Sequence, residues 1–134
     1  MPHISVIIPV YNAGNYIVDT LNSVLQQTLK DIEVIVVNDG SNDQSLAECY
    51  RLQEIDKRII IINQDNQGVS KARNVGKQNA TGDYIIFIDA DDELDCRMLE
   101  KMCIRDRNGA GRCEKGWLHV AAAGRLRMME KNVV

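Results

Sequence analysis

The sequence predicts an α/β fold in which a mostly parallel four-stranded sheet is flanked by helices. Four short apolar runs, rich in β-branched residues, begin roughly 25 to 28 residues apart, and each gap between them is long enough for one helix. Continuous apolar runs, as opposed to alternating ones, are typical of strands buried on both faces of a parallel sheet. The predicted strands are Ile4–Val10, Ile32–Val37, Ile59–Ile62 and Tyr84–Ile88.

Three helices are predicted between these strands. The first carries apolar residues over Tyr16–Leu25 at steps of three and four, which lays a stripe along one helical face. The second is predicted to begin at a capping box formed by Ser41 and Gln44 and to end near Asp56. The third follows Gly68 and has a small-residue face able to pack close to a sheet, made of Val69, Ala72, Val75, Gly76 and Ala80.

Length and composition indicate one soluble domain. A chain of 134 residues with 45% hydrophobic residues is long enough to bury a core. The apolar runs are too short to cross a bilayer, and the N-terminus lacks the basic start of a signal peptide, so we expect a cytoplasmic protein. The cysteines form no C-x-x-C pair, and free buried thiols are expected at Cys49, Cys96, Cys103 and Cys113.

Charge divides the chain into two parts. Residues 1–100 contain 16 acidic and 8 basic residues, a formal charge of -8, whereas residues 101–134 contain 3 acidic and 8 basic residues, a formal charge of +5. An acidic body argues against nucleic-acid binding, which needs many Lys and Arg contacts to phosphate. It tolerates an anionic ligand only through a metal ion or backbone amides.

Polar residues follow the strands at the edge where open α/β sheets bind ligands, because right-handed crossovers bring the carboxyl ends of parallel strands together. We expect Asp39 either to accept hydrogen bonds from a base or ribose or to cap the next helix. Tyr11 either stacks on a base or plugs the sheet edge. Gly68 and Arg73, at the start of the third helix, can support a phosphate, and Arg73 can equally pair with a surface acid. The residues expected to line one crevice are Pro9, Tyr11, Asn12, Asn38, Asp39, Ser41, Asp65, Asn66, Gln67, Gly68, Asp89 and Asp91.

An acidic cluster follows the fourth predicted strand directly. Because successive side chains of a strand alternate, Asp89 and Asp91 are predicted to point the same way across the small Ala90, whereas Asp92 points elsewhere. Two close carboxylates repel each other unless a cation lies between them, and oxygen ligands suit Mg²⁺ or Mn²⁺. The cluster therefore predicts a metal-dependent phosphate site.

Five sequence blocks occur in order along the first 100 residues, namely Ile4–Asn12, Ser23–Thr28, Glu33–Ser41, Asn66–Asn74 and Ala80–Asp92. Together they resemble the family 2 glycosyltransferases, enzymes of the GT-A fold that use nucleotide-diphosphate sugars. The resemblance implies that Pro9 and Tyr11 flank the nucleobase, Asp39 binds base or ribose, Asp89 lies on the ribose side and Asp91 binds the metal on the diphosphate. The full set of predicted nucleotide-sugar-binding residues is Pro9, Tyr11, Asn12, Asp39, Gly68, Arg73, Asp89 and Ala90, with Asp91 as the metal ligand.

The resemblance also implies an activity. It implies an inverting transfer of a sugar to an acceptor hydroxyl, with Mn²⁺ or Mg²⁺ as cofactor. The implied acceptor is a glycan or a lipid-linked glycan, and the implied process is cell-surface polysaccharide synthesis. A carboxylate base must take the acceptor's proton. Family members supply that base well downstream of the D-x-D motif, and no such residue is recognisable in this sequence. A nucleotide-sugar-binding fragment without turnover is therefore the alternative.

The likeness stops after about Leu99. We interpret residues 1–100 as the nucleotide-sugar-binding part, a Rossmann-like GT-A half-domain, of a chain truncated or altered after about residue 100. Residues 101–134 are interpreted as an atypical basic tail that is non-native or disordered, and the swing in charge favours a non-native origin. Alternatively, Trp117–Lys131 forms a short basic helix that touches a membrane, which would place the protein at the inner face of the membrane.

Overall fold

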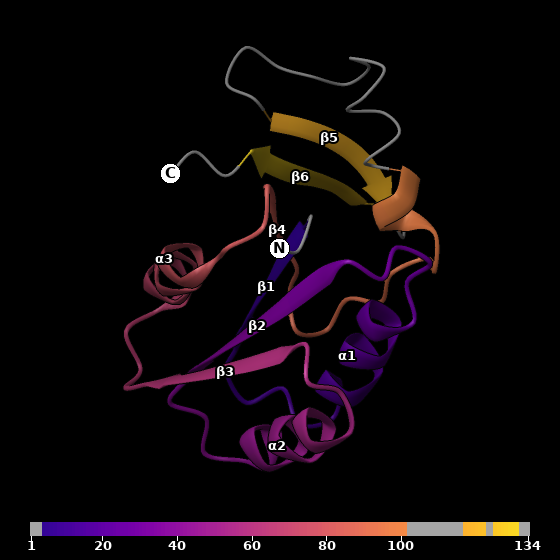
Figure 1. The fold of residues 1–134 in the computed structure, drawn as a ribbon. Helices are drawn as coiled ribbons and strands as arrows, with labels where there is room; N and C mark the ends of the chain where they lie inside the picture. The colour runs from indigo at the N-terminus through magenta and orange to yellow at the C-terminus, as the bar shows by residue number, and fades with distance from the viewer. Residues whose placement is uncertain (1–3, 102–116, 123–124, 132–134) are drawn as a thin grey trace.

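The computed structural model describes residues 4–101, 117–122 and 125–131 and is built on a six-stranded sheet (Figure 1). The strand order is β3-β2-β1-β4-β6-β5. The four predicted strands form the parallel part of the sheet, as β1 (Ile4–Val10), β2 (Ile32–Asp39), β3 (Ile59–Gln64) and β4 (Tyr84–Phe87). Ile4 lies opposite both Ile32 and Tyr84, so three of these strands begin at one level. Their carboxyl ends consequently share one edge of the sheet.

The other two strands form an antiparallel pair that extends this sheet. They are β5 (Trp117–Ala122) and β6 (Arg125–Lys131), and β6 pairs with β4. The interpretation of Trp117–Lys131 as a basic helix is therefore wrong, and the membrane contact loses the element on which it was based. Charged and apolar residues alternate from Arg125 to Met128, a period of two that suits a strand. The boundary near residue 100 and the non-native origin of the tail stay predictions.

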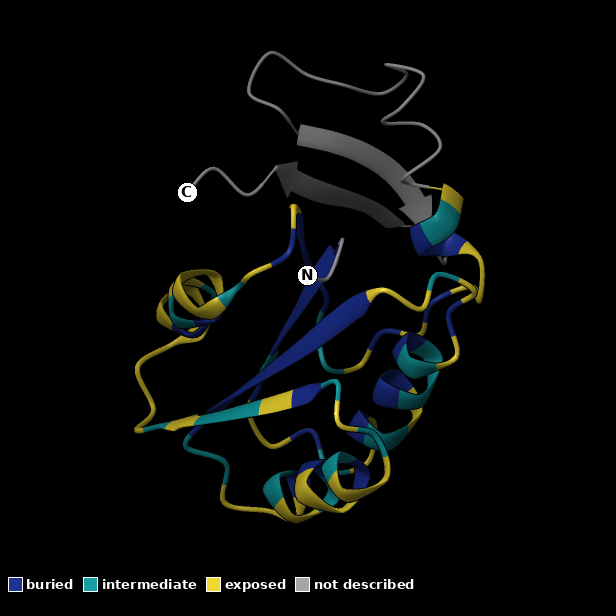
Figure 2. Cartoon of the chain, in the orientation of Figure 1, coloured by how far each residue is buried: buried dark blue, intermediate teal, exposed yellow. Residues whose placement is uncertain are grey.

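Helices cover both faces of the parallel part of the sheet. They are α1 (Ile17–Leu25), α2 (Ser45–Ile55) and α3 (Val69–Asn79). Figure 1 shows α1 and α2 on one side of the sheet and α3 on the other. Along β1, Val6 and Ile8 join the hydrophobic cluster under α1 and α2, whereas Ile7 joins the cluster under α3. Because both faces are covered, β1, β2 and β4 are almost entirely buried (Figure 2), which explains their continuous apolar runs.

The small residues of α3 allow its close approach to the sheet, as predicted. Ala72 is fully buried against β1 and β2. A Cβ atom added at Gly76 would lie 2.5 Å from Cγ2 of Ile7, so the helix backbone lies nearer to the strand than any larger residue permits. The apolar stripe of α1 is also confirmed, since Ile17 and Leu21 are fully buried.

The predicted start of α2 is wrong by three residues, because the N-cap is Gln44 and not Ser41. The helix begins at Ser45, and Ser41 lies in the preceding loop, where its hydroxyl accepts a hydrogen bond from the N–H of Asn12 at 3.0 Å. The entry to the helix is instead organised by Asp43, whose Oδ1 accepts the N–H of Ser45 at 2.9 Å. The two side chains that resemble a capping box in sequence are therefore not used as one.

The described cysteines are free thiols in different environments. Cys49 is buried in the core, and burial, together with the nearby charge of Glu48, raises the pKa of its thiol to about 12. Cys96 is exposed, so the expectation of buried thiols is wrong for this residue. Cys103 and Cys113 lie outside the described residues. Within the described part of the chain, no helix is both long and apolar enough to span a membrane.

Candidate nucleotide and metal site

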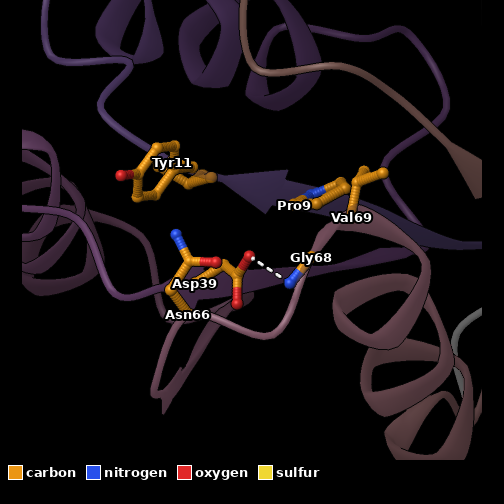
Figure 3. A pocket seen from close by; sticks show the side chains of 7 residues that line it. Pro9, Tyr11, Asp39, Asn66, Gly68 and Val69 are labelled. Atoms are coloured by element: carbon orange, nitrogen blue, oxygen red, sulfur yellow. Dashed lines mark hydrogen bonds between the residues drawn. The ribbon is translucent and has the colours of Figure 1, made fainter.

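Two adjoining pockets lie at the carboxyl-end edge of the parallel strands. The first has a volume of about 300 Å³ (Figure 3) and is lined by Pro9, Val10, Tyr11, Asp39, Asn66, Gly68 and Val69. The second has a volume of about 340 Å³ and is lined by Pro9, Tyr11, Asn12, Ala13, Tyr16, Val69, Asp89, Ala90 and Asp91. Because Pro9, Tyr11 and Val69 line both pockets, the two form one continuous crevice, named the edge crevice below.

The edge crevice brings together most of the residues that the sequence predicts, although four of the twelve expected to line one crevice do not line either pocket, namely Asn38, Ser41, Asp65 and Gln67. Eight of the nine predicted site residues line it, and the ninth, Arg73, contacts one of the lining acids. Four lining residues were missed as site residues, namely Val10, Ala13, Tyr16 and Val69, and the last two have the larger exposed side chains. Tyr16 precedes α1 and is 57% exposed, although its spacing assigned it to the apolar stripe, and Val69 was assigned to the packing face of α3. The signal for both was their position directly after a loop at the carboxyl ends of the strands.

Tyr11 directly follows β1 and presents its ring to the crevice. Its side chain is 51% exposed, which argues against a residue that plugs the sheet edge. In Figure 3, Tyr11 lies across the pocket from Pro9 and Val69, and Asp39 lies between these two sides. The next residue, Asn12, has a φ of 48°, a left-handed conformation that turns the chain away from the strand. An aromatic ring and two apolar side chains therefore border the pocket.

Asp39 ends β2 and is almost completely buried. Its Oδ1 accepts hydrogen bonds from Nε2 of Gln64 at 2.9 Å and from the N–H of Gln67 at 2.8 Å, and its Oδ2 accepts the N–H of Gly68 at 3.0 Å. Burial opposes ionisation, but these three hydrogen bonds outweigh it and lower the pKa of Asp39 below its usual value. The carboxylate thus lies at the N-terminus of α3, where the helix dipole also favours a negative charge.

This contact changes what Asp39 and Gly68 are free to do. Asp39 does not cap α2, the next helix along the chain, and instead holds the loop that precedes α3. At the helix start that we expected to support a phosphate, the Gly68 N–H already donates to Asp39. Gly68 nevertheless lines the pocket, and its φ of 97° is a conformation that favours glycine.

Two loops at the edge crevice are tied to each other through Asn12. Its N–H donates to the hydroxyl of Ser41, and its side-chain Oδ1 accepts the N–H of Asn42 at 2.7 Å. The N–H of Gly14 donates to Oδ2 of Asp43 at 3.0 Å. These hydrogen bonds fix the loop that carries Asn12 to the loop after β2. They thereby hold Asn12 in place where it lines the crevice.

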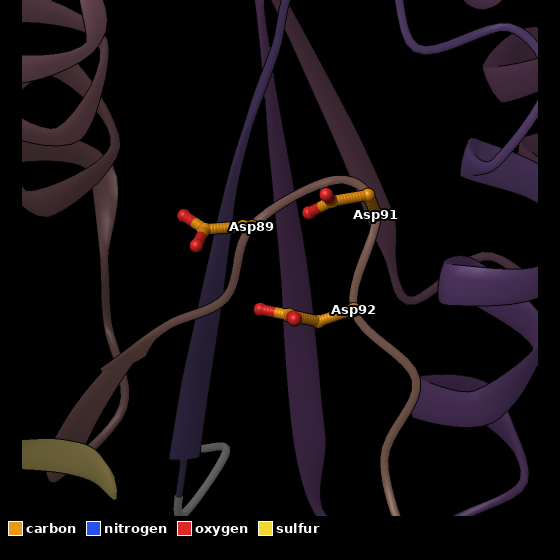
Figure 4. A group of neighbouring side chains, drawn as sticks. All are labelled: Asp89, Asp91 and Asp92. Atoms are coloured by element: carbon orange, nitrogen blue, oxygen red, sulfur yellow. The ribbon is translucent and has the colours of Figure 1, made fainter. Parts of the chain in front are cut away.

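Asp89, Asp91 and Asp92 converge at the end of β4 (Figure 4). Each offers a carboxylate oxygen, and these oxygens lie within 4.8 Å of one another. The prediction that Asp92 points elsewhere is wrong, because β4 ends at Phe87 and the alternation of a strand no longer applies. The N–H of Asp92 instead donates to the carbonyl of Asp89 at 3.0 Å and closes a turn.

The three carboxylates have the composition of a site for a hard cation. Oxygen ligands are those that Mg²⁺ and Mn²⁺ prefer, and Asp92 is buried while Asp91 is exposed, so the cluster opens towards the crevice. Arg73 of α3 lies beside it, with Nη2 3.4 Å from Oδ1 of Asp89. Both partners of this ion pair are about two-fifths exposed, so solvent screens it and its contribution to stability is small.

An apolar, tyrosine-lined pocket beside a carboxylate cluster, at the carboxyl edge of a parallel sheet, is typical of nucleotide-binding α/β proteins. The sequence matches the model of Glycosyl transferase family 2 over residues 5–105, and the chain belongs to this family. It is 46% identical over 99 residues to glycosyltransferase GlyA of Streptococcus pneumoniae, covering 74% of this chain and 14% of GlyA. It is 44% identical over 104 residues to the uncharacterized glycosyltransferase EpsJ of Bacillus subtilis, covering 76% of this chain and 30% of EpsJ.

Solved structures share the fold. Residues 1–349 of Staphylococcus aureus TarS superpose with a TM-score of 0.73 and 31% identity, covering 80% of this chain and 33% of that one. The same TarS fragment in complex with UDP-GlcNAc gives a TM-score of 0.76 at 25% identity. The match covers 97% of this chain and 45% of the TarS chain. The mannosyltransferase PcManGT of Pyrobaculum calidifontis, in complex with GDP-Man and Mn²⁺, gives a TM-score of 0.67 at 27% identity. The match covers 72% of this chain and 29% of the PcManGT chain. The Rossmann-like GT-A fold is thus confirmed, and the chain spans less than half the length of each protein named.

Proposed function

We propose that this chain binds the nucleotide-diphosphate sugar donor of a metal-dependent glycosyltransferase that transfers the sugar to an acceptor hydroxyl. One observation carries the proposal: the pocket bordered by Tyr11 and Asp39 is continuous with the pocket at Asp89 and Asp91. The pockets to which we assign the base and the diphosphate are therefore adjacent, as a nucleotide-diphosphate sugar requires. The family assignment and the ligands of TarS and PcManGT support this reading.

Each side chain has a role that its surroundings permit. Pro9 and Tyr11 flank the nucleobase from two sides of the pocket. Asp39 accepts hydrogen bonds from base or ribose, since its two oxygens offer about four lone-pair sites and three are used internally. Asp89 lies on the ribose side, and Asp91, with Asp92 beside it, holds Mn²⁺ or Mg²⁺.

The residues of the chain bind and orient the donor, and the acceptor hydroxyl attacks the anomeric carbon with inversion. When bound, the metal ion neutralises negative charge that develops on the departing diphosphate. Arg73 brings a further positive charge to the edge of the same crevice. We assign no catalytic base among the described residues. The acceptor, a glycan or a lipid-linked glycan, belongs to this proposal as well.

A nucleotide-sugar-binding fragment without turnover is the second candidate. It is favoured by the described residues, which supply the side chains of the edge crevice and the carboxylate cluster but among which we assign no catalytic base. Hydrolysis and transfer assays on UDP-, GDP- and dTDP-sugars with Mn²⁺ separate the two. Sugar release above the level of an inactive variant supports an enzyme, and donor binding without release supports the second candidate.

The metal role of Asp91 predicts the effect of its removal. Asp91→Ala takes one carboxylate from the cluster, and we expect it to abolish Mn²⁺-dependent nucleotide binding. Calorimetric titration of UDP or GDP, with and without Mn²⁺, measures this directly. The matched control is Glu93→Gln, which removes an exposed negative charge two residues away but outside the cluster, and should leave binding unchanged. Equal Mn²⁺-dependent affinity in Asp91→Ala and the unchanged protein would refute the assignment.

A further inference from the structure

A side chain of α1 reaches the turn that carries the acidic cluster. The hydroxyl of Thr20 donates a hydrogen bond of 2.8 Å to the carbonyl oxygen of Ala90, which lies 70 residues further along the chain. Thr20 is only 1% exposed, so water does not compete for this contact. The hydrogen bond therefore joins the core side of α1 to the middle of the turn from Asp89 to Asp92.

The position of this contact within the turn decides what it controls. In a four-residue turn the two common conformations differ mainly by a flip of the central peptide, which reverses its carbonyl. Here the turn is closed by the hydrogen bond from Asp92 to Asp89, and the central peptide is the one that joins Ala90 to Asp91. Holding the Ala90 carbonyl towards Thr20 selects one orientation of that peptide, and with it the direction from which the Asp91 side chain leaves the backbone.

Neighbouring polar residues, Ser23 of α1 and Gln27 just after the helix, have other targets. Ser23 accepts the N–H of Leu94 at 3.1 Å through its hydroxyl. The side chain of Gln27 donates to the carbonyl of Asp95 at 2.7 Å and accepts the N–H of Leu99 at 3.1 Å. These contacts hold the segment that follows the turn, whereas Thr20 acts on the turn itself.

We propose that Thr20 is a positioning residue for the cation site, because its hydroxyl fixes the central peptide of the turn and so presets Asp91 beside Asp89 and Asp92. The inference rests on the proposed function, in which these carboxylates hold the metal ion. Preorganised ligands bind an ion more tightly than ligands that must first be ordered. Thr20 touches neither the ion nor the donor in this scheme.

The test compares variants that differ in one hydrogen bond. Thr20→Val keeps the shape of the side chain but removes the donor, and Thr20→Ser restores it. We expect Thr20→Val to weaken Mn²⁺ affinity in the presence of UDP by roughly 3- to 10-fold, the equivalent of one intramolecular hydrogen bond. Thr20→Ser should recover most of this loss, and binding of uridine, which carries no phosphate, should not change.

A matched control separates positioning from a general loss of stability. Ser5→Ala removes another fully buried hydroxyl, which bonds Glu33 and the N–H of Gly82 at the opposite edge of the sheet. We expect this variant to lower the melting temperature without changing Mn²⁺ affinity. Should Thr20→Val fail to fold, Ala90→Gly loosens the same turn from within and should weaken Mn²⁺ affinity to a similar degree.

The outcomes are distinct from those of the proposed function. Loss of Mn²⁺ affinity in Thr20→Val with recovery in Thr20→Ser supports the positioning role. Unchanged affinity in Thr20→Val, or in Ala90→Gly where that variant is used, overturns the positioning role alone. An equal loss in Ser5→Ala also overturns it. If the unchanged protein shows no Mn²⁺-dependent binding of UDP or GDP, the proposed function itself fails.

Discussion

At the scale of single residues, Asp39 has a structural role as well as its proposed role in binding the nucleotide. It ends β2 inside the edge crevice, and its carboxylate already accepts three hydrogen bonds from the segment that leads into α3. Binding a nucleotide therefore does not require Asp39 to be brought into place. The same bonds make it a stabilising residue in the absence of any ligand, so its substitution should affect both folding and binding.

Asp39→Asn tests the stabilising part. The new amide group presents a donor where one carboxylate oxygen accepts an N–H, so one buried contact is lost and we expect about 1–3 kcal/mol less free energy of unfolding. Urea unfolding at pH 7 measures it. Asp31→Asn removes an exposed charge at the start of β2 and serves as the control, with little expected change. Equal stability of both variants would contradict the role of Asp39.

The pH dependence of this contribution has a definite sign. The folded-state pKa of Asp39 is lowered from 3.8, so the folded protein binds a proton at this group less readily than the unfolded chain does. The stabilisation is fully present above the unfolded value near pH 4 and is lost as the pH falls through the lower folded value. We expect the difference in unfolding free energy between the unchanged protein and Asp39→Asn to shrink below about pH 4, and acid titration of both by circular dichroism measures it.

At the scale of elements, strands β1 to β4 and helices α1 to α3 were predictable because their signals are local, whereas β5 and β6 were missed. The apolar runs and the small-residue face of α3 are patterns that can be recognised within one short segment of sequence. The start of α2 was not predictable in this way, because Ser41 is used by Asn12, a residue from another loop. The direction of Asp92 depends likewise on a turn that begins where β4 stops.

The contact between α3 and β1 gives a prediction at this scale. Gly76→Ala should raise the intrinsic helix propensity by about 1 kcal/mol, yet the added methyl group would meet the fully buried Ile7 at 2.5 Å. Overpacking of this kind typically costs about 1–3 kcal/mol, so we expect a net loss of stability in urea unfolding. Asn74→Ala, at an exposed position of the same helix, gains propensity without a clash and should be neutral or stabilising. A more stable Gly76→Ala variant would show that the helix can move away from the strand.

At the scale of the whole molecule, the site follows from topology more than from any single motif. Pro9, Asp39, Gly68 and Asp89 come from four separate segments, and they meet because parallel strands end at one edge. That meeting was predictable from the rhythm of strands and helices. The pairing of β6 with β4 was not, because it joins segments separated by an irregular sequence in which no periodic apolar face is evident.

Charge at this scale sets the conditions for binding the donor. Residues 1–100 carry a formal charge of -8, and three carboxylates converge where the diphosphate is proposed to lie. A bare diphosphate brought to this edge is repelled, whereas a nucleoside without phosphates is not. A divalent ion offsets most of the negative charge of the three carboxylates and can itself bind phosphate oxygens, so the metal should decide which of the two ligands binds more tightly.

A paired titration tests this dependence on the metal ion. Without a divalent ion, we expect uridine to bind at least as tightly as UDP, and added NaCl should narrow the difference because salt screens the repulsion. With Mn²⁺, UDP should bind at least about tenfold more tightly than uridine, equivalent to about 1.4 kcal/mol. Guanosine with GDP, and thymidine with dTDP, extend the comparison to other bases. In Asp91→Ala, uridine should bind at least as tightly as UDP at every Mn²⁺ concentration. The reason is that the remaining carboxylates still repel the diphosphate while no metal ion is held to offset them. Tight metal-free binding of UDP, undiminished by EDTA, would mean that the diphosphate avoids the acidic cluster.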